Sequence, residues 1–476
     1  MQAHKRGVNP DDPDDASARL QTLLNEIGGA GGGVLSLKPG RYVLDNPLFI
    51  HDSNVVLRGA GKDKTILYFP RPLAESLHPG FQWSWTGGQI FFTSRERLAA
   101  SKAEGFKWRD EGGAEGWLAG EEVAAVAPAP RGTQVLLVDD TRSFTAGEMA
   151  LLEVKDPPTS NHRMLREMAG DVEGAHSFPW EDTSLDGFAW TWPVVVTDVL
   201  SPRTIRIEQP LRVAIHPESA ARFRTLGPTV HDSGVESLTI ENRLVTQTVH
   251  NENLGSNGVC FQAVHDCWAT AIHVLNADVA FGMTSAKSCT LTGISAGGRS
   301  LHHFTISREA SADNLIQDFV LGDFTVPAAA GSYLHGINVE QLSSGNVWRR
   351  GVMHTGTFDS HRGLPFENLR TDIVLVNKDA VPGGGFQAGP QFGARSVHWG
   401  ITVTSGETLG MDITDVAPRS LTAGIVGLSE PGSRLRGVPS NSYFAGELES
   451  ERLAFGTDLG SGRDLLAIQR ETLPVT

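Results

Sequence analysis

The first 70 residues alternate very short apolar segments with glycine-rich turns, and this pattern constrains the fold more than any other feature of the chain. Residues 14–27 predict an amphipathic helix, which the glycine-rich run Gly28–Gly33 ends. The apolar positions of this helix are Leu20, Leu23, Leu24 and Ile27. Apolar segments follow within 34–44, 55–61 and 65–67, punctuated by glycine, proline, asparagine or aspartate. Segments this short, repeated in series, predict the stacked coils of a solenoid rather than long hairpins.

An internal repeat supports a solenoid in the second half of the chain. Residues 301–306 align with residues 334–339 at an offset of 33, and both segments begin with Leu-His. Asn314 and Asn346 align at an offset of 32, and Asn368 follows 22 residues later. Asparagine at equivalent positions of successive coils predicts a ladder of stacked side-chain amides at a bend.

The N-terminal segment resembles the opening of the pectate-lyase-like, right-handed parallel β-helix superfamily. The resemblance lies in the predicted helix, the string from Gly31 to Tyr42, and the string from Leu57 to Gly61 followed by Thr65. It implies an all-β fold, a right-handed parallel β-helix with an N-terminal capping helix, and a polysaccharide or oligosaccharide as partner. Because such solenoids carry lyases, hydrolases, epimerases and phage tailspikes, the resemblance implies carbohydrate chemistry without fixing the reaction.

The pattern divides the chain into four parts. Residues 1–80 predict the cap and first coils, and residues 231–435 the main β-helix. Between them, residues 81–230 contain a predicted helix over 93–105 and apolar strands separated by longer polar loops, which predict an inserted β-rich subdomain. Residues 436–476 are expected to cover the last coil, because an open coil exposes unpaired backbone groups.

Composition excludes several partners. The net charge of −15 disfavours nucleic acid and anionic membranes. No segment approaches the roughly 18–20 apolar residues that span a bilayer. The N-terminus lacks a secretory signal, so we expect a cytoplasmic protein, or a secreted or periplasmic one if the chain is a trimmed mature form. Cys267 and Cys289 lie 22 residues apart and are interpreted as stacked core residues. The oligomeric state stays open.

Arginine is much more frequent than lysine, with 31 arginines and nine lysines. Beyond residue 231 only Lys287 and Lys378 remain, so cations in that half come from arginine or histidine. Arginine suits the bidentate binding of a carboxylate, such as that of a uronic acid, although codon bias explains the same preference.

Histidine, arginine, tyrosine and carboxylate side chains that could act in catalysis concentrate between residues 299 and 372. No metal-binding motif, nucleophile elbow or phosphate-binding loop is present, so the sequence predicts neither a metal nor another cofactor. The residues predicted to be catalytic are Tyr333, His335, Glu340, Asp359, His361 and Arg362. Those predicted to bind substrate are His303, Arg308, Glu309, Arg349, Trp180 and Trp190.

Each of these predictions has an alternative. Asp359, His361 and Arg362 place a carboxylate, an imidazole and a guanidinium within four residues, beside Gly363 and Pro365. Such a set in a loop favours a role in catalysis. Tyr333 and His335 could share a face and move protons at a sugar ring. By period-2 alternation, however, His335 is also a candidate inward, hydrogen-bonded histidine, and Glu340 a solvated outward residue. Arg349 and Arg350 are equally compatible with a surface pair. The tryptophans fit either sugar stacking or a hydrophobic core.

Three functions fit these residues. The favoured one is a polysaccharide lyase that acts by β-elimination at a uronic acid. The second is a glycoside hydrolase or transglycosidase, whose two carboxyl groups would lie about 5–5.5 Å or about 6.5–9.5 Å apart. Glu309, Glu340, Asp359 and Glu367 are its candidate carboxylates. The third is a non-catalytic, tailspike-like solenoid that binds glycans.

Overall fold

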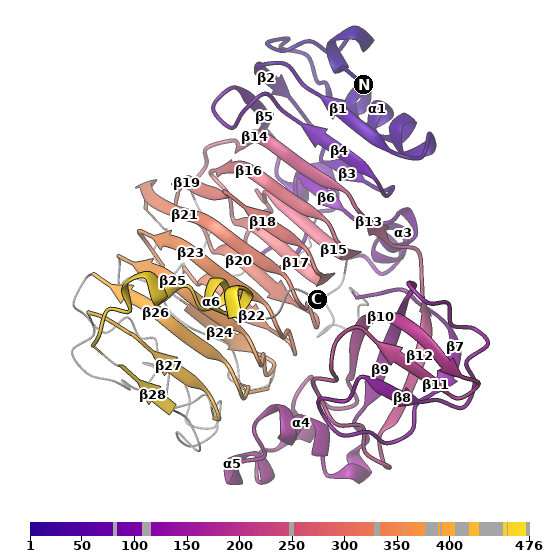
Figure 1. Cartoon of the computed structure of the whole chain (residues 1–476). Helices are drawn as coiled ribbons and strands as arrows, with labels where there is room; N and C mark the ends of the chain where they lie inside the picture. The colour runs from indigo at the N-terminus through magenta and orange to yellow at the C-terminus, as the bar shows by residue number, and fades with distance from the viewer. Residues whose placement is uncertain are drawn as a thin grey trace.

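The chain forms a solenoid of parallel strands with a smaller antiparallel domain beside it (Figure 1). The computed structural model describes residues 1–79, 83–106, 116–246, 252–327, 334–356, 358–376, 389–390, 393–404, 418–427, 451–454 and 456–472. Tyr333 lies outside the described residues.

Two parallel sheets make up the solenoid. The fourteen-stranded sheet contains β1 (Gly33–Ser36), β2 (Gly40–Val43), β4 (Val55–Arg58), β5 (Thr65–Phe69), β14 (Gly234–Asn242), β16 (Trp268–Leu275), β18 (Thr290–Thr292), β19 (Ser295–Arg299), β21 (Leu315–Val326), β23 (Val347–Met353), β25 (Leu369–Leu375), β26 (Val397–Val403), β27 (Leu421–Ala423) and β28 (Glu451–Leu453). The eight-stranded sheet contains β3 (Leu48–Ile50), β6 (Ile90–Phe92), β13 (Val230–His231), β15 (Val259–His265), β17 (Val279–Lys287), β20 (His303–Arg308), β22 (Gly336–Glu340) and β24 (Phe358–Arg362).

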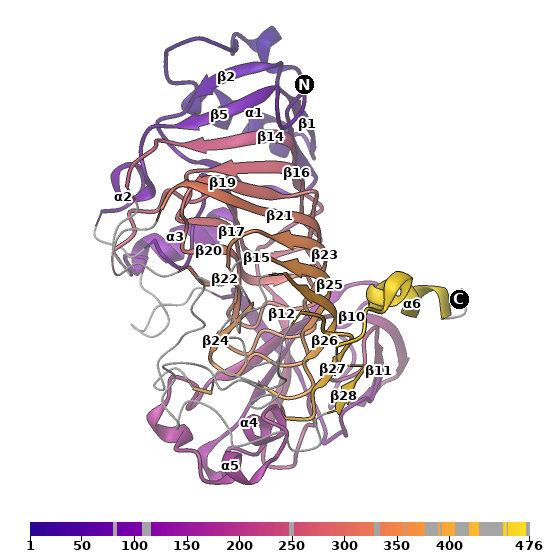
Figure 2. The ribbon, with the colours of Figure 1, turned by 90° about the vertical axis from the view of Figure 1, so that its left-hand side faces the viewer.

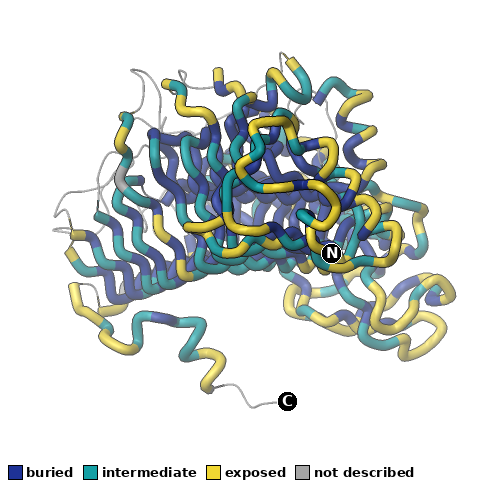
Figure 3. Tube along the Cα trace, turned by 90° about the horizontal axis from the view of Figure 1, so that it is seen from above, coloured by how far each residue is buried: buried dark blue, intermediate teal, exposed yellow. Residues whose placement is uncertain are grey.

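Successive coils stack in register, which confirms the predicted right-handed parallel β-helix. Val235 of β14 pairs with Ala269 of β16, which pairs in turn with Leu291 of β18. Figure 2 shows β14, β16, β21, β23 and β25 stacked in this order. Their inward side chains form one apolar core along the solenoid, seen from above as a buried interior in Figure 3. This stacking brings residues one coil apart in sequence into adjacent positions.

The N-terminal helix covers the first coil, as predicted. Helix α1 (Ser17–Gly29) buries Leu20, Leu23, Leu24 and Ile27 against the core. After the helix, Gly31, Gly32 and Gly33 all have positive φ, and a Cβ added to Gly32 would lie 2.6 Å from the backbone oxygen of Asn54. The glycine run therefore both stops the helix and lets the next coil approach closely.

The predicted asparagine ladder is confirmed. Asn314 Nδ2 donates to Asn346 Oδ1 at 2.8 Å, and Asn346 Nδ2 donates to Asn368 Oδ1 at 3.0 Å. The same oxygens accept backbone N–H groups of the neighbouring coil. These buried amides fix one bend of the solenoid from coil to coil.

The inserted β-rich subdomain is a six-stranded antiparallel sheet. Its strands are β7 (Ala119–Ala125), β8 (Val135–Leu137), β9 (Met149–Lys155), β10 (Ala189–Ser201), β11 (Thr204–Ile207) and β12 (Ala220–Leu226), with helices α4 (Arg163–Met168) and α5 (Glu173–His176) between β9 and β10. Helix α3 (Arg95–Ala103) confirms the predicted helix, and α2 (Leu73–Ser76) precedes β6. Because β6 pairs with β3 and β15, the start of the range 81–230 belongs to the solenoid, and the antiparallel sheet begins at residue 119.

The subdomain is fixed to the solenoid by apolar packing and a buried ion network. Its core includes side chains of the solenoid turns at Ala310, Ala312, Leu342, Leu364 and Phe366. Arg212 contacts Asp313, which also contacts Lys287. Lys287 Nζ donates to Gln209 Oε1 at 2.6 Å, and Arg212 Nη1 donates to Glu367 Oε2 at 3.2 Å.

The described part of the C-terminal range adds β28 beside β27 at the end of the fourteen-stranded sheet and then packs against the outside of this sheet. Helix α6 (Leu465–Thr472) lies beside β25 and β26 (Figure 2). Trp399 Nε1 donates to the carbonyl of Gly462 at 2.7 Å, and Thr371 Oγ1 to that of Arg463 at 2.7 Å. Within the described residues, no helix is long and apolar enough to cross a bilayer.

Candidate functional site

The candidate site lies on the outward face of β20, β22 and β24. Ile337, Val339 and Phe358 of these strands point into the core. Alternation therefore directs Asn338, Glu340 and Asp359 outward. Their register places Asn338 opposite Asp359 and Glu340 opposite Arg362. The shift between these two pairs lets His361 and Arg362, although adjacent in sequence, both join the outward group.

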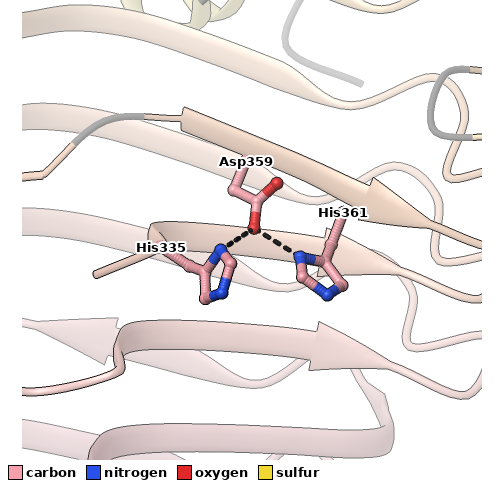
Figure 4. A group of neighbouring side chains, drawn as sticks. All are labelled: His335, Asp359 and His361. Carbon is pink, nitrogen blue, oxygen red and sulfur yellow. Dashed lines mark hydrogen bonds and ion pairs between the residues drawn. The ribbon is translucent and has the colours of Figure 1, made fainter. Parts of the chain in front are cut away.

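One carboxylate holds two imidazoles. Asp359 Oδ2 lies 2.7 Å from His361 Nδ1 and 2.9 Å from His335 Nδ1 (Figure 4). Asn338 Nδ2 donates to the same oxygen at 3.3 Å. An ionised carboxylate only accepts hydrogen bonds, so each Nδ1 carries the proton and the lone pair of a neutral ring lies on Nε2. The arrangement thus fixes the tautomer of both histidines.

Burial and charge set the protonation of this group. Burial raises the pKa of Asp359, but the charges and hydrogen bonds of His361 and His335 outweigh burial and hold the pKa well below its usual range. Burial lowers the pKa of His361, and the attraction of Asp359 only partly offsets it. Asp359 is therefore ionised and His361 neutral near pH 7, which is the state required of a general base.

A second charged group lies beside the first. Glu340 Oε1 accepts from Arg308 Nε at 3.0 Å, and Oε2 accepts from Arg362 Nε at 3.3 Å. Burial raises the pKa of Glu340, but Arg362 and Arg308 lower it below its usual value. Arg308 is almost completely buried, whereas the Arg362 side chain is 14% exposed. Arg362 is therefore the guanidinium of this pair that a ligand reaches first.

Trp85 covers the imidazoles. Its ring centroid lies 5.4 Å from that of His361 and 5.2 Å from that of His303, and the Arg362 guanidinium lies 5.0 Å from it. His302 completes the cluster at 4.9 Å from His335. All these rings are buried, and His361 is 4% exposed. In this conformation the indole closes the site.

The imidazole group is also the one set of described residues with the spacing of a metal site. The ligand atoms of His335, Asp359 and His361 lie within 4.8 Å of one another. In the arrangement seen here, however, Asp359 Oδ2 lies against Nδ1 of both imidazoles. A cation bound between these atoms would have to displace both contacts.

The structure brings most of the predicted site residues together. His303, Arg308, Glu309, His335, Glu340, Asp359, His361 and Arg362 all lie on β20, β22 and β24 or directly beside these strands. Glu340 faces outward as predicted, but it is buried between two arginines instead of solvated. His335 does not point inward: Gly336 has φ +68°, which reverses the alternation at the start of β22.

Three predicted substrate-binding residues lie elsewhere. Arg349 belongs to β23 of the other sheet, where it pairs with Asp464. Trp180 and Trp190 are buried in the core of the inserted subdomain, so their rings present no face for sugar stacking. The burial of both indoles favours the alternative interpretation of these tryptophans as core.

The cluster contains two further residues, Trp85 and His302, that the sequence does not predict to belong to the site. Trp85 precedes β6, more than 200 positions before the histidines, so only the stacking of coils reveals its position. His302 adjoins His303, and this histidine doublet is the sequence signal that could have identified it.

Comparisons with known proteins give distant structural neighbours. No protein-family model and no curated protein matches the chain. The gp54 tailspike of Acinetobacter baumannii bacteriophage AP22, solved with a capsular saccharide, is 9% identical, with a TM-score of 0.45 over 95% of this chain and 69% of its own. The tailspike gp49 of Pseudomonas phage LKA1 is 9% identical, with a TM-score of 0.45 over 96% and 77%. The A-module of the Azotobacter vinelandii mannuronan C-5 epimerase AlgE6 is 11% identical, with a TM-score of 0.39 over 89% and 80%. The β-helical fold itself follows from the register of this chain's own parallel strands.

Proposed function

We propose that this protein is a polysaccharide lyase that cleaves a uronic-acid-containing glycan by β-elimination. The observation that carries the proposal is the buried Asp359 carboxylate, which holds His335 and His361 in one tautomer beside the Arg308–Glu340–Arg362 group. A neutral, oriented imidazole next to a guanidinium combines the base and the carboxylate-binding cation that this reaction needs.

In the proposed reaction, Arg362 binds the uronate carboxylate and stabilises the negative charge that develops on it. His361 Nε2 removes the proton at C5. The electron pair of the C5–H bond forms the C4–C5 double bond while the C4–O bond breaks, and the leaving oxygen takes up a proton. Tyr333, which the sequence predicts to move protons at the sugar ring together with His335, lies outside the described residues, and its part in this step stays a prediction.

Substrate entry requires Trp85 to move. The indole lies over His361, His303 and Arg362, so a sugar ring at the imidazole would take its place. We propose that the sugar ring replaces the indole in its contacts with these side chains.

The protonation states of three of the four candidate carboxylates favour a lyase over a glycoside hydrolase. A hydrolase needs one carboxyl group that keeps its proton near neutral pH. The pKa values of Glu340, Asp359 and Glu367 are all lowered, in each case because cationic or imidazole neighbours outweigh burial. None of these three side chains has the raised pKa of a general acid.

A panel of polysaccharides tests the proposal, each reaction followed by the ultraviolet absorbance of an unsaturated uronate and by new reducing ends. We expect both signals to rise together on a uronic-acid polymer. Reducing ends without absorbance would establish a hydrolase instead. If neither signal rises on any glycan while saccharide binding is retained, the non-catalytic solenoid would be favoured.

Treatment of the protein with a chelator tests whether the His335–Asp359–His361 group acts as a hydrogen-bonded base or as a metal site. Because Asp359 already binds the protons of both imidazoles, we expect the rate to be unchanged by chelation. Loss of activity on chelation, restored by a divalent cation, would indicate a metal centre instead of a general base.

A further inference from the structure

We infer that a pocket next to the imidazole cluster binds a second, anionic sugar of the same glycan chain, an inference that rests on the proposed uronic-acid substrate. The pocket encloses about 490 Å³ of free space, part of it open to solvent. Its walls come from β5, the segment before α2, the ends of β14 and β19, and the turns before β15 and β17. The residues that carry the inference are Phe69, Pro72, Arg243, Leu254, Asp278 and Arg299.

The floor of the pocket holds a buried guanidinium with unused hydrogen-bonding capacity. Arg299 is 1% exposed, and its Nη2 donates to Asp278 Oδ1 at 2.5 Å. Its Nη1 donates to the carbonyl of Ser300 at 3.0 Å, while its buried Nε has no hydrogen-bond partner among the described residues. A buried donor without a partner is costly, so a ligand that brings an acceptor oxygen lowers this cost once the side chain turns toward the pocket.

Asp278 holds the wall of the pocket in place through its hydrogen bonds. Its Oδ2 accepts the backbone N–H groups of Gly255 and Ser256 at 3.1 and 2.8 Å, and its Oδ1 accepts from Asn253 Nδ2 at 3.2 Å. With Arg299, these donors satisfy both carboxylate oxygens. Asp278 therefore positions the guanidinium and the turn before β15. Because both of its carboxylate oxygens are occupied, the pocket offers a ligand hydrogen-bond donors and not acceptors.

The rim supplies a second cation and an apolar wall. Arg243 is 47% exposed, and within the part of the chain that the structure describes it pairs with Glu75, itself 46% exposed, at 3.4 Å. Such an exposed pair contributes little to stability, so Arg243 can turn to a carboxylate at low cost. Leu254 is 44% exposed and faces the same space as Phe69 and Pro72. An apolar wall opposite two guanidinium groups fits a pyranose ring, whose faces carry C–H groups, with a carboxylate at its edge.

The pocket and the imidazole cluster share a turn of the solenoid. The carbonyl oxygen of Asp278 accepts the backbone N–H groups of His302 at 2.8 Å and His303 at 3.2 Å. Asp359 lies on β24, three coils beyond Asp278 and β17, roughly 14 Å away at about 4.8 Å per coil. A sugar in the pocket would therefore lie a few units along the glycan from the cleaved sugar, so the pocket would favour long chains over short ones.

A kinetic comparison of Arg243→Ala with Arg58→Ala tests the inference. Arg58 is a matched control, because its side chain is 48% exposed and pairs with Glu236 outside the pocket. On oligogalacturonates and oligomannuronates of increasing length, we expect Arg243→Ala to lower kcat/KM for long chains about tenfold, as for one charge-assisted hydrogen bond, and to leave the shortest cleaved chain unchanged. Equal behaviour of the two variants at every length would overturn the inference while leaving the lyase intact.

A binding measurement separates failure of the pocket from failure of the lyase. Calorimetry on His361→Ala would compare long oligogalacturonates and oligomannuronates with their carboxyl-reduced counterparts. We expect the charged chains to bind more tightly, and Arg243→Ala in the same background to remove that advantage. Such binding without cleavage of any uronide by the unaltered protein would support the pocket and reject the lyase. Equal binding of charged and reduced chains would overturn the anionic ligand.

Discussion

At the scale of single residues, the neutral state of His361 predicts the pH dependence of the proposed reaction. Burial lowers its pKa, so His361 stays unprotonated to a lower pH than an ordinary histidine. We expect the acid limb of kcat/KM to have its midpoint below about pH 6.5, the usual histidine value. His361→Ala should lower kcat about 10²–10⁴-fold, the range typical of a general base.

Asp359→Asn probes the support of that base. Removing the carboxylate removes the attraction that raises the His361 pKa, so the acid limb should shift to still lower pH while kcat falls. Asp318→Asn is the control, because Asp318 pairs with the partly exposed Arg350 on the other sheet. An acid limb that is identical in Asp359→Asn and the unaltered protein would contradict the assignment of this limb to His361.

Glu340 is predicted to be needed for folding as well as for placing Arg362. It is completely buried between Arg308 and Arg362, and breaking a buried ion pair on one side costs about 3–5 kcal/mol. We expect Glu340→Gln to lower the free energy of unfolding by about 3 kcal/mol in urea denaturation. Glu26→Gln, which breaks an exposed pair with Arg6, should change it by less than about 1 kcal/mol. Similar small losses in both variants would show that the arginines find other partners.

At the scale of elements, the asparagine ladder is the contact that fixes one bend from coil to coil. Asn346 accepts two hydrogen bonds from Asn314 and donates one to Asn368 and one to the Ser311 carbonyl. Asn346→Ala leaves buried donors and acceptors without partners, so we expect a loss of about 3 kcal/mol in the free energy of unfolding. Exposed Asn46→Ala should change it by less than about 0.5 kcal/mol in the same denaturation experiment. A loss of that size at Asn346 would mean that water replaces the ladder.

The elements also show what the sequence could and could not predict. Asn314 and Asn346 were predictable because a fixed offset marks equivalent positions on successive coils. Asp359 and His361 were predictable as a pair because residues two apart on a strand share a face. The outward turn of His335 was not, because it depends on the positive φ of Gly336. The repeat alone predicts Arg349 near the site, but its strand belongs to the other sheet, which the repeat does not reveal.

At the scale of the whole molecule, the buried network around Asp313 predicts how the inserted subdomain is held to the solenoid. Burial raises the pKa of Asp313, but Arg212 and Lys287 lower it below its usual value. A carboxylate whose pKa is lower in the folded protein stabilises it above the unfolded pKa of about 3.9. That stabilisation is lost as the pH falls through the lower, folded value. Acid should therefore loosen this interface.

Asp313→Ala tests this attachment directly near pH 7. It would leave the buried Lys287 without its carboxylate, which costs about 3–5 kcal/mol, while the half-buried Arg212 keeps Glu367. Asp313→Leu combined with Lys287→Met should lose less, because it removes both buried charges of that pair. We expect Asp313→Ala to lower the urea midpoint and to speed proteolysis of the subdomain before that of the solenoid. Simultaneous cleavage of both parts would mean that subdomain and solenoid unfold as one unit, held by the apolar packing of Ala310, Leu342 and Phe366 rather than by the ion network.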